Sequence, residues 1–192
     1  TDTHWLKNQM MSPFLIKYIA EHTTCKKLLF GGDACGGELK DSPTIGREQA
    51  MKHMEVMSGI ALSVGVYQAR GNHDFWGFST SFVDANGLKN DAVANAIMFP
   101  LNHNIVRNDN SETNGCYYYF DVEYAKIRYV VLDLFDYIGK TDYTSWANNI
   151  LHVITNEQKE WIANNALKNA PEGYSIVMMA HISPLAIMSE GY

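Results

Sequence analysis

Apolar residues recur along the chain in two patterns, short continuous runs that suit buried strands and longer runs with helical spacing. The strand-like runs are bounded by glycine or polar residues and alternate with the helix-like segments. The expected strands span residues 27–30, 64–69 and 175–180, and the expected helices span residues 14–21 and 47–63 and a segment that opens at Thr155. This alternation predicts an α/β fold.

Two further runs, residues 117–122 and 127–132, are rich in aromatic and β-branched residues and are joined by a short link. They predict a β-hairpin. The three consecutive tyrosines 117–119 are expected to alternate between the two faces of the sheet. Residues 34–46 and 75–114 are expected to be loops that shape a pocket, with short helices at 81–85 and 91–98.

Polar side chains follow three of the predicted strands at the point where each strand ends. They are Asp33, Asn72 and His181. Because ligands of open α/β sheets bind beyond the carboxyl ends of the strands, these residues predict a shared site there. Each also has a simpler explanation on its own, since Asp33 and Asn72 could form turns and His181 could be an ordinary hydrogen-bonded histidine.

The chemistry of these side chains points to metal ions. Carboxylate and imidazole groups suit divalent manganese, iron or zinc. One carboxylate can bridge two such ions, and the pair then lowers the pKa of a bound water enough to give hydroxide near neutral pH. The same positive charge stabilises a phosphoryl group during transfer.

Four short segments carry candidate ligands in order along the chain: Asp2-Thr3-His4, Gly32-Asp33, Gly71-Asn72-His73-Asp74 and His181-Ile182-Ser183-Pro184. This ordered set, which spans residues 2 to 185, resembles that of the calcineurin-like metallophosphoesterase superfamily. The most specific member is G-N-H-D. The resemblance implies an αββα sandwich of two mixed sheets flanked by helices, with the site at the carboxyl ends of the strands.

The resemblance also implies a role for each residue. Asp2 and His4 would bind a first metal ion, and Asp33 would bridge it to a second. Asn72 and His181 would bind the second ion. His73 would act as the general acid that protonates the leaving oxygen, and Asp74 would orient His73. The implied activity is hydrolysis of a phosphomonoester or a small phosphodiester by hydroxide generated at two divalent metal ions.

Composition narrows the remaining choices. The 192 residues and 46% hydrophobic content suit one domain over residues 1–192. A net charge of −6 argues against a nucleic-acid-binding protein, and no apolar run is long enough for a membrane helix. The three cysteines form no C-x-x-C pair, which indicates free thiols and favours a cytoplasmic location, although secretion stays open.

The chain departs from the family pattern at two places. Only Thr1 precedes Asp2, and no G-H-x-H motif, which would give each metal ion one more histidine, occurs in the sequence. We therefore expect the domain to be incomplete at both ends. A nuclease of the same family and a non-catalytic scaffold with an incomplete metal site remain as alternatives. Arg70 and Arg107 could each contact a phosphate, but a structural ion pair is expected for both.

Overall fold

The computed structural model describes residues 11–33, 53, 55, 57–59, 65–71, 104–108, 116–136 and 153–182. Within these residues the chain forms a mixed α/β structure. Its helices are α1 (Met11–His22), η2 (Glu123–Ala125), α5 (Asn156–Trp161) and η3 (Ile162–Leu167), and its strands are β1 (Lys27–Phe30), β2 (Gly65–Gln68), β3 (Val106–Arg107), β4 (Tyr118–Val122), β5 (Ile127–Val131), β6 (Phe135–Asp136), β7 (Val153–Ile154) and β8 (Ser175–Met179).

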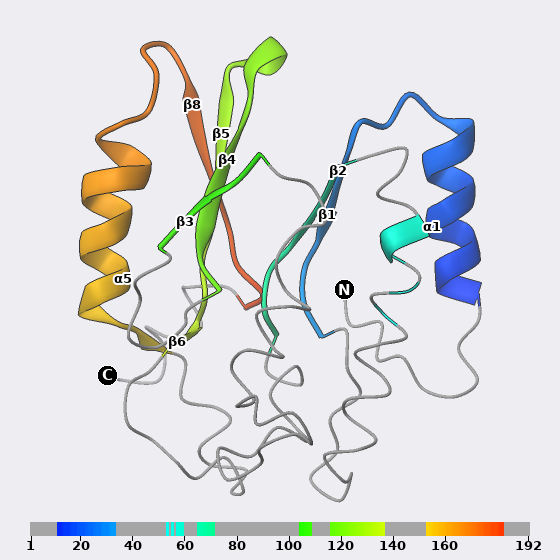
Figure 1. The fold of residues 1–192 in the computed structure, drawn as a ribbon, viewed down its shortest axis with the longest axis horizontal. Helices are drawn as coiled ribbons and strands as arrows, with labels where there is room; N and C mark the ends of the chain where they lie inside the picture. Colours follow the sequence, from blue (N-terminus) through cyan, green and yellow to red (C-terminus); the bar gives the residue numbers. More distant parts are fainter. Residues whose placement is uncertain are drawn as a thin grey trace, which may run out of the picture.

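Two main sheets lie face to face in the described part of the chain (Figure 1). One pairs β1 with β2 in parallel, and the other has the order β3-β4-β5-β8. In the second sheet β4 and β5 form an antiparallel hairpin, whereas β5 and β8 are parallel. Helix α5 covers the outer face of the four-stranded sheet, and α1 lies on the far side of the two-stranded sheet (Figure 1).

The expected strands and hairpin are confirmed to within a residue at each end. β2, β4 and β5 are largely buried, whereas most of β8 is exposed. The first helix begins earlier than expected, because α1 starts at Met11. Pro13 lies in its first turn. Proline is tolerated there because the first-turn N–H groups have no helical partner. The short helices expected at 81–85 and 91–98 lie outside the described residues.

The expected helix start at Thr155 is confirmed, since the Thr155 hydroxyl caps α5 by accepting a hydrogen bond of 3.1 Å from the backbone N–H of Gln158. The helix continues as the π-helical segment η3, which the sequence did not predict. The core beneath this helix contains Val130, Leu132, Leu134, Ile162 and Ala166. It therefore buries the outer face of the four-stranded sheet.

The tyrosine run alternates between faces as expected. Tyr117 and Tyr119 contact Trp161 on the helical side, with ring centroids 5.3 and 5.9 Å away. Tyr118 points the other way into the core between the sheets, which contains Tyr67, Ala69, Phe120, Val122 and Val131. The hairpin of β4 and β5 is thus covered on both faces, whereas β3 and most of β8 are exposed.

The hydroxyl of Tyr118 joins the two sheets. It accepts a hydrogen bond of 2.7 Å from the backbone N–H of Gln68 and donates one of 2.8 Å to the carbonyl oxygen of the same residue. Burial raises the pKa of Tyr118 far above its ordinary range, so the phenol stays protonated and keeps its donor. Next to it, the rings of Tyr67 and Phe120 stack across the same gap.

The side chain of Gln68 also holds a buried histidine. Its amide oxygen accepts a hydrogen bond from Nε2 of His53, a residue in a helical segment whose imidazole also contacts the ring of Phe30. His53 is fully buried, and this burial lowers its pKa from 6.5 to about 4, against the smaller opposing effect of the hydrogen bond to Gln68. His53 is therefore neutral in the folded protein.

This neutral histidine predicts a pH-dependent stability. In the unfolded chain His53 takes up a proton near pH 6.5, whereas in the folded protein it does so only near pH 4. The free energy of unfolding should therefore fall as the pH drops through this window, by about 2 to 3 kcal/mol between pH 7.5 and pH 4.5. Urea unfolding at the two pH values measures the loss.

The control is His53→Gln, whose amide can donate the same hydrogen bond but does not titrate. Its stability should fall less over the same range, and the difference between the two proteins isolates the contribution of His53. Equal pH dependence in both proteins would contradict the assignment.

Candidate functional site

The backbone turns sharply as it leaves β1. Gly32 has a φ of 101°, and Asp33 has a φ of 55°, which also lies in the left-handed region. Glycine adopts this conformation without cost, whereas aspartate tolerates it at a modest one. The turn buries the Asp33 side chain, which is only 5% exposed, at the carboxyl end of the strand.

His181 reaches the same place from the other sheet. It follows β8 and Ala180, and its Nδ1 lies 2.7 Å from the carbonyl oxygen of Gly31, 150 residues away in sequence. Because a carbonyl can only accept, Nδ1 must carry the proton, and the neutral ring then has its lone pair on Nε2. Nε2 lies 3.4 Å from a carboxylate oxygen of Asp33.

Gly71, which follows β2, completes this arrangement. A β-carbon on Gly71 would overlap the carboxylate and the backbone nitrogen of Asp33. A β-carbon on Gly32 would lie 2.7 Å from Nδ1 of His181 and 2.8 Å from the backbone nitrogen of Gly71. We call Gly31, Gly32, Asp33, Gly71 and His181 the strand-end cluster. Its close packing requires glycine at two positions.

The two polar side chains of the strand-end cluster fit a divalent metal ion. A histidine that donates Nδ1–H to a backbone carbonyl and presents Nε2 has the orientation that metal-binding histidines use. Two ligand atoms about 2.1 Å from one ion, at a tetrahedral angle, are roughly 3.4 Å apart. The observed separation of Nε2 and the Asp33 oxygen is 3.4 Å. The same pair could also form a direct ion pair if His181 were protonated.

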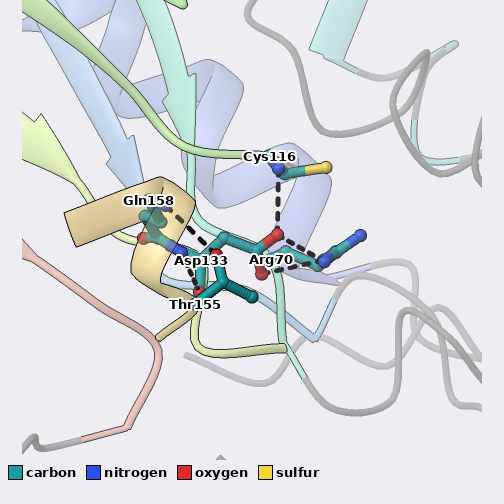
Figure 2. Close-up of polar contacts among 5 residues, drawn as sticks. All are labelled: Arg70, Cys116, Asp133, Thr155 and Gln158. Atoms are coloured by element: carbon teal, nitrogen blue, oxygen red, sulfur yellow. Dashed lines mark hydrogen bonds and ion pairs between the residues drawn. The ribbon is translucent and has the colours of Figure 1, made fainter. Parts of the chain in front are cut away.

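Arg70, which directly precedes Gly71 of this cluster in the sequence, is held by a buried network (Figure 2). Its Nε donates to Oδ1 of Asp133 at 3.0 Å, and its Nη2 contacts the other oxygen of the same carboxylate. The backbone N–H of Cys116 donates to Asp133 at 2.9 Å. The side chains of Arg70 and Asp133 are both buried, and their contact confirms the expected structural ion pair for Arg70.

Gln158 fixes the backbone of Asp133. Its side-chain oxygen accepts from the backbone N–H of Asp133 at 3.0 Å, and its side-chain nitrogen donates to the Asp133 carbonyl at 2.8 Å (Figure 2). Asp133 was not among the residues predicted for the site. Its position could have suggested it, because Asp133 follows a predicted strand just as Asp33 and His181 do.

Of the residues expected to form the site, the structure brings Asp33 and His181 together. The other expected residues, Asp2, His4, Asn72, His73 and Asp74, lie outside the described part of the chain. Within the described part, no group of three or more His, Cys, Asp or Glu side chains is arranged to hold a metal ion. A search of the same residues finds no helix that is long and apolar enough to cross a membrane.

Comparison of the chain with protein-family models, with curated proteins and with solved structures found no match.

The close approach at Gly71 predicts the effect of adding one methyl group. Gly71→Ala should destabilise the protein by about 1 to 3 kcal/mol, because the new β-carbon has to displace Asp33. The backbone itself would accept alanine, since the φ of Gly71 is not positive. Urea unfolding measures the change.

Gly59→Ala is the matched control. A β-carbon at this exposed, helical glycine would meet no atom within 4 Å. Alanine should leave the stability unchanged or raise it by up to about 1 kcal/mol. The account of the strand-end cluster is wrong if both substitutions have the same effect.

Proposed function

We propose that the chain is a metal-dependent phosphoester hydrolase with an αββα sandwich of the calcineurin-like metallophosphoesterase type. The observation that carries the proposal is the meeting of Asp33 and His181 at 3.4 Å, from the ends of strands in two different sheets. The ordered motifs in the sequence give the site its expected composition. The proposed substrates are phosphomonoesters or small phosphodiesters.

Two further observations support a functional site at this position. Asp33 is a buried carboxylate in the left-handed backbone region, and such strained residues cluster at functional sites. His181 is held by one hydrogen bond in the tautomer that metal binding needs. A simple turn at Asp33 would not require a histidine of the other sheet to face its carboxylate.

In the proposed site Asp33, Asn72, His181, Asp2 and His4 would hold two divalent ions, with Asp33 shared between the ion held by Asn72 and His181 and the ion held by Asp2 and His4. Such ions, manganese, iron or zinc, would supply hydroxide near neutral pH and positive charge against the phosphoryl oxygens. His73 donates a proton to the leaving oxygen, and Asp74 orients the His73 imidazole and stabilises its charged form.

The proposal is tested by hydrolysis of p-nitrophenyl phosphate and its bis ester by protein loaded with Mn²⁺. We expect turnover that a chelator removes. Asp33→Asn and His181→Ala should weaken Mn²⁺ binding and lower turnover, because each removes a ligand. His22→Ala is the control, since His22 lies exposed on α1 and contacts only its own helix among the contacts described.

The role of His73 has a more specific test. His73→Ala should lower kcat about 100- to 10,000-fold for phenyl phosphate, whose leaving group needs a proton. The loss should be smaller for p-nitrophenyl phosphate, whose leaving group is stable as an anion. Absence of turnover with every ester, or equal activity of wild type and Asp33→Asn, would overturn the proposed function.

A further inference from the structure

We propose that Arg70 and Asp133 act as a positioning pair for the strand-end cluster, setting the geometry in which Asp33 and His181 bind a divalent cation. The inference rests on the proposed function and extends it to residues that do not bind the ion themselves. It depends on the buried network of Figure 2 and on its links to both sheets.

The first link runs to Asp33. Arg70 directly precedes Gly71, and the backbone of Gly71 packs against the carboxylate and the backbone nitrogen of Asp33. The guanidinium of Arg70 contacts both oxygens of Asp133, which fixes its direction as well as its distance. Anchoring Arg70 therefore anchors the segment that limits where the Asp33 carboxylate can lie.

The second link runs to His181. Leu132, the neighbour of Asp133, donates its backbone N–H to the carbonyl of Met179 at 2.8 Å, two residues before His181. Asp133 thus continues the strand that pairs with β8. Asp133 therefore contacts Arg70, which precedes the segment packed against Asp33. Its neighbour Leu132 is hydrogen-bonded to β8, the strand that His181 follows.

Asp133 can hold Arg70 in place because hydrogen bonds fix both its backbone and its carboxylate. Gln158 bonds both its backbone N–H and its carbonyl, and the N–H of Cys116 bonds its carboxylate. Gln158 is in turn fixed at the start of α5 by Thr155. The helix that covers the four-stranded sheet is therefore coupled to the site through four residues.

A purely stabilising role would be a weak explanation for this pair. Desolvating two charges largely cancels their attraction, and apolar replacements of a buried ion pair are often neutral or stabilising. A bidentate contact adds directional control that apolar packing does not supply. The double variant R70M/D133L separates the two roles, because it removes both charges together and leaves neither one unpaired.

The chain offers a matched control in Arg128 and Asp121. Nε and Nη2 of Arg128 each donate to one oxygen of Asp121 at 2.7 Å, so the geometry is also bidentate. These residues are paired neighbours on β4 and β5, and Asp121 precedes the hairpin at the opposite end of the sheet from His181. R128M/D121L therefore removes a bidentate Arg–Asp pair, together with the bond from Arg128 to the Ala166 carbonyl, away from the strand-end cluster.

Two measurements decide the inference. Mn²⁺ affinity, followed by electron paramagnetic resonance, should fall about 10- to 100-fold in R70M/D133L and stay within twofold of wild type in R128M/D121L. In metal-free protein, the NMR signal of the Nδ1–H of His181, assigned by its loss in His181→Ala, should shift in the first variant alone. Thermal unfolding of each variant shows that it is folded.

Arg70→Lys provides a second variant if R70M/D133L does not fold. Lysine keeps the charge but cannot form the two parallel hydrogen bonds, so Mn²⁺ affinity should again fall and the His181 signal should again shift. Wild-type Mn²⁺ affinity and an unchanged signal in a folded Arg70 variant would overturn the inference, as would equal losses in the control.

The outcomes also separate this inference from the proposed function. A wild-type protein that binds Mn²⁺ but hydrolyses no ester contradicts the proposed function and leaves the positioning role to be decided by Mn²⁺ affinity and the His181 signal. A protein that hydrolyses esters with unchanged kcat and Mn²⁺ affinity in R70M/D133L contradicts only the positioning role.

Discussion

The geometry of the strand-end cluster depends on how the two sheets pack against each other. Asp33 comes from the sheet of β1 and β2, whereas His181 comes from the sheet that contains β8. A hydrogen bond such as the one from His181 to the Gly31 carbonyl, at 2.7 Å, tolerates shifts of only a few tenths of an ångström. The sheets must therefore be fixed against sliding, and stacked rings, the Tyr118 hydroxyl and the Arg70–Asp133 pair each span the gap.

Much of the described fold could be predicted from the sequence because its longer strands are rich in apolar residues. The mostly buried strands β4 and β5 consist of aromatic and β-branched residues with one charged residue each, Asp121 or Arg128. The strands β3, β6 and β7 have two residues each, too few for any periodicity. The π-helical segment η3 could not be predicted either, because its buried residues Ile162 and Ala166 have the four-residue spacing of an ordinary α-helix.

The site was predictable in part for a topological reason. Ligands of α/β sheets bind beyond the carboxyl ends of the strands, so a polar residue after each strand can be named as a candidate without coordinates. The meeting of Asp33 and His181 depends in addition on how the two sheets are placed. The pairing of Arg70 with Asp133 could not be assigned in this way. The two residues lie 63 positions apart and follow strands of different sheets, and only the relative placement of those sheets makes them partners.

The hydroxyl of Tyr118 also has a consequence for the buried backbone of β2. The N–H of Ala69 bonds the Phe30 carbonyl, so the backbone groups of Gln68 face away from β1. Gln68 is fully buried and out of reach of water, and Tyr118 bonds both its N–H and its carbonyl. A single phenol from the facing sheet thus spares the protein the free-energy cost of burying two backbone groups without partners.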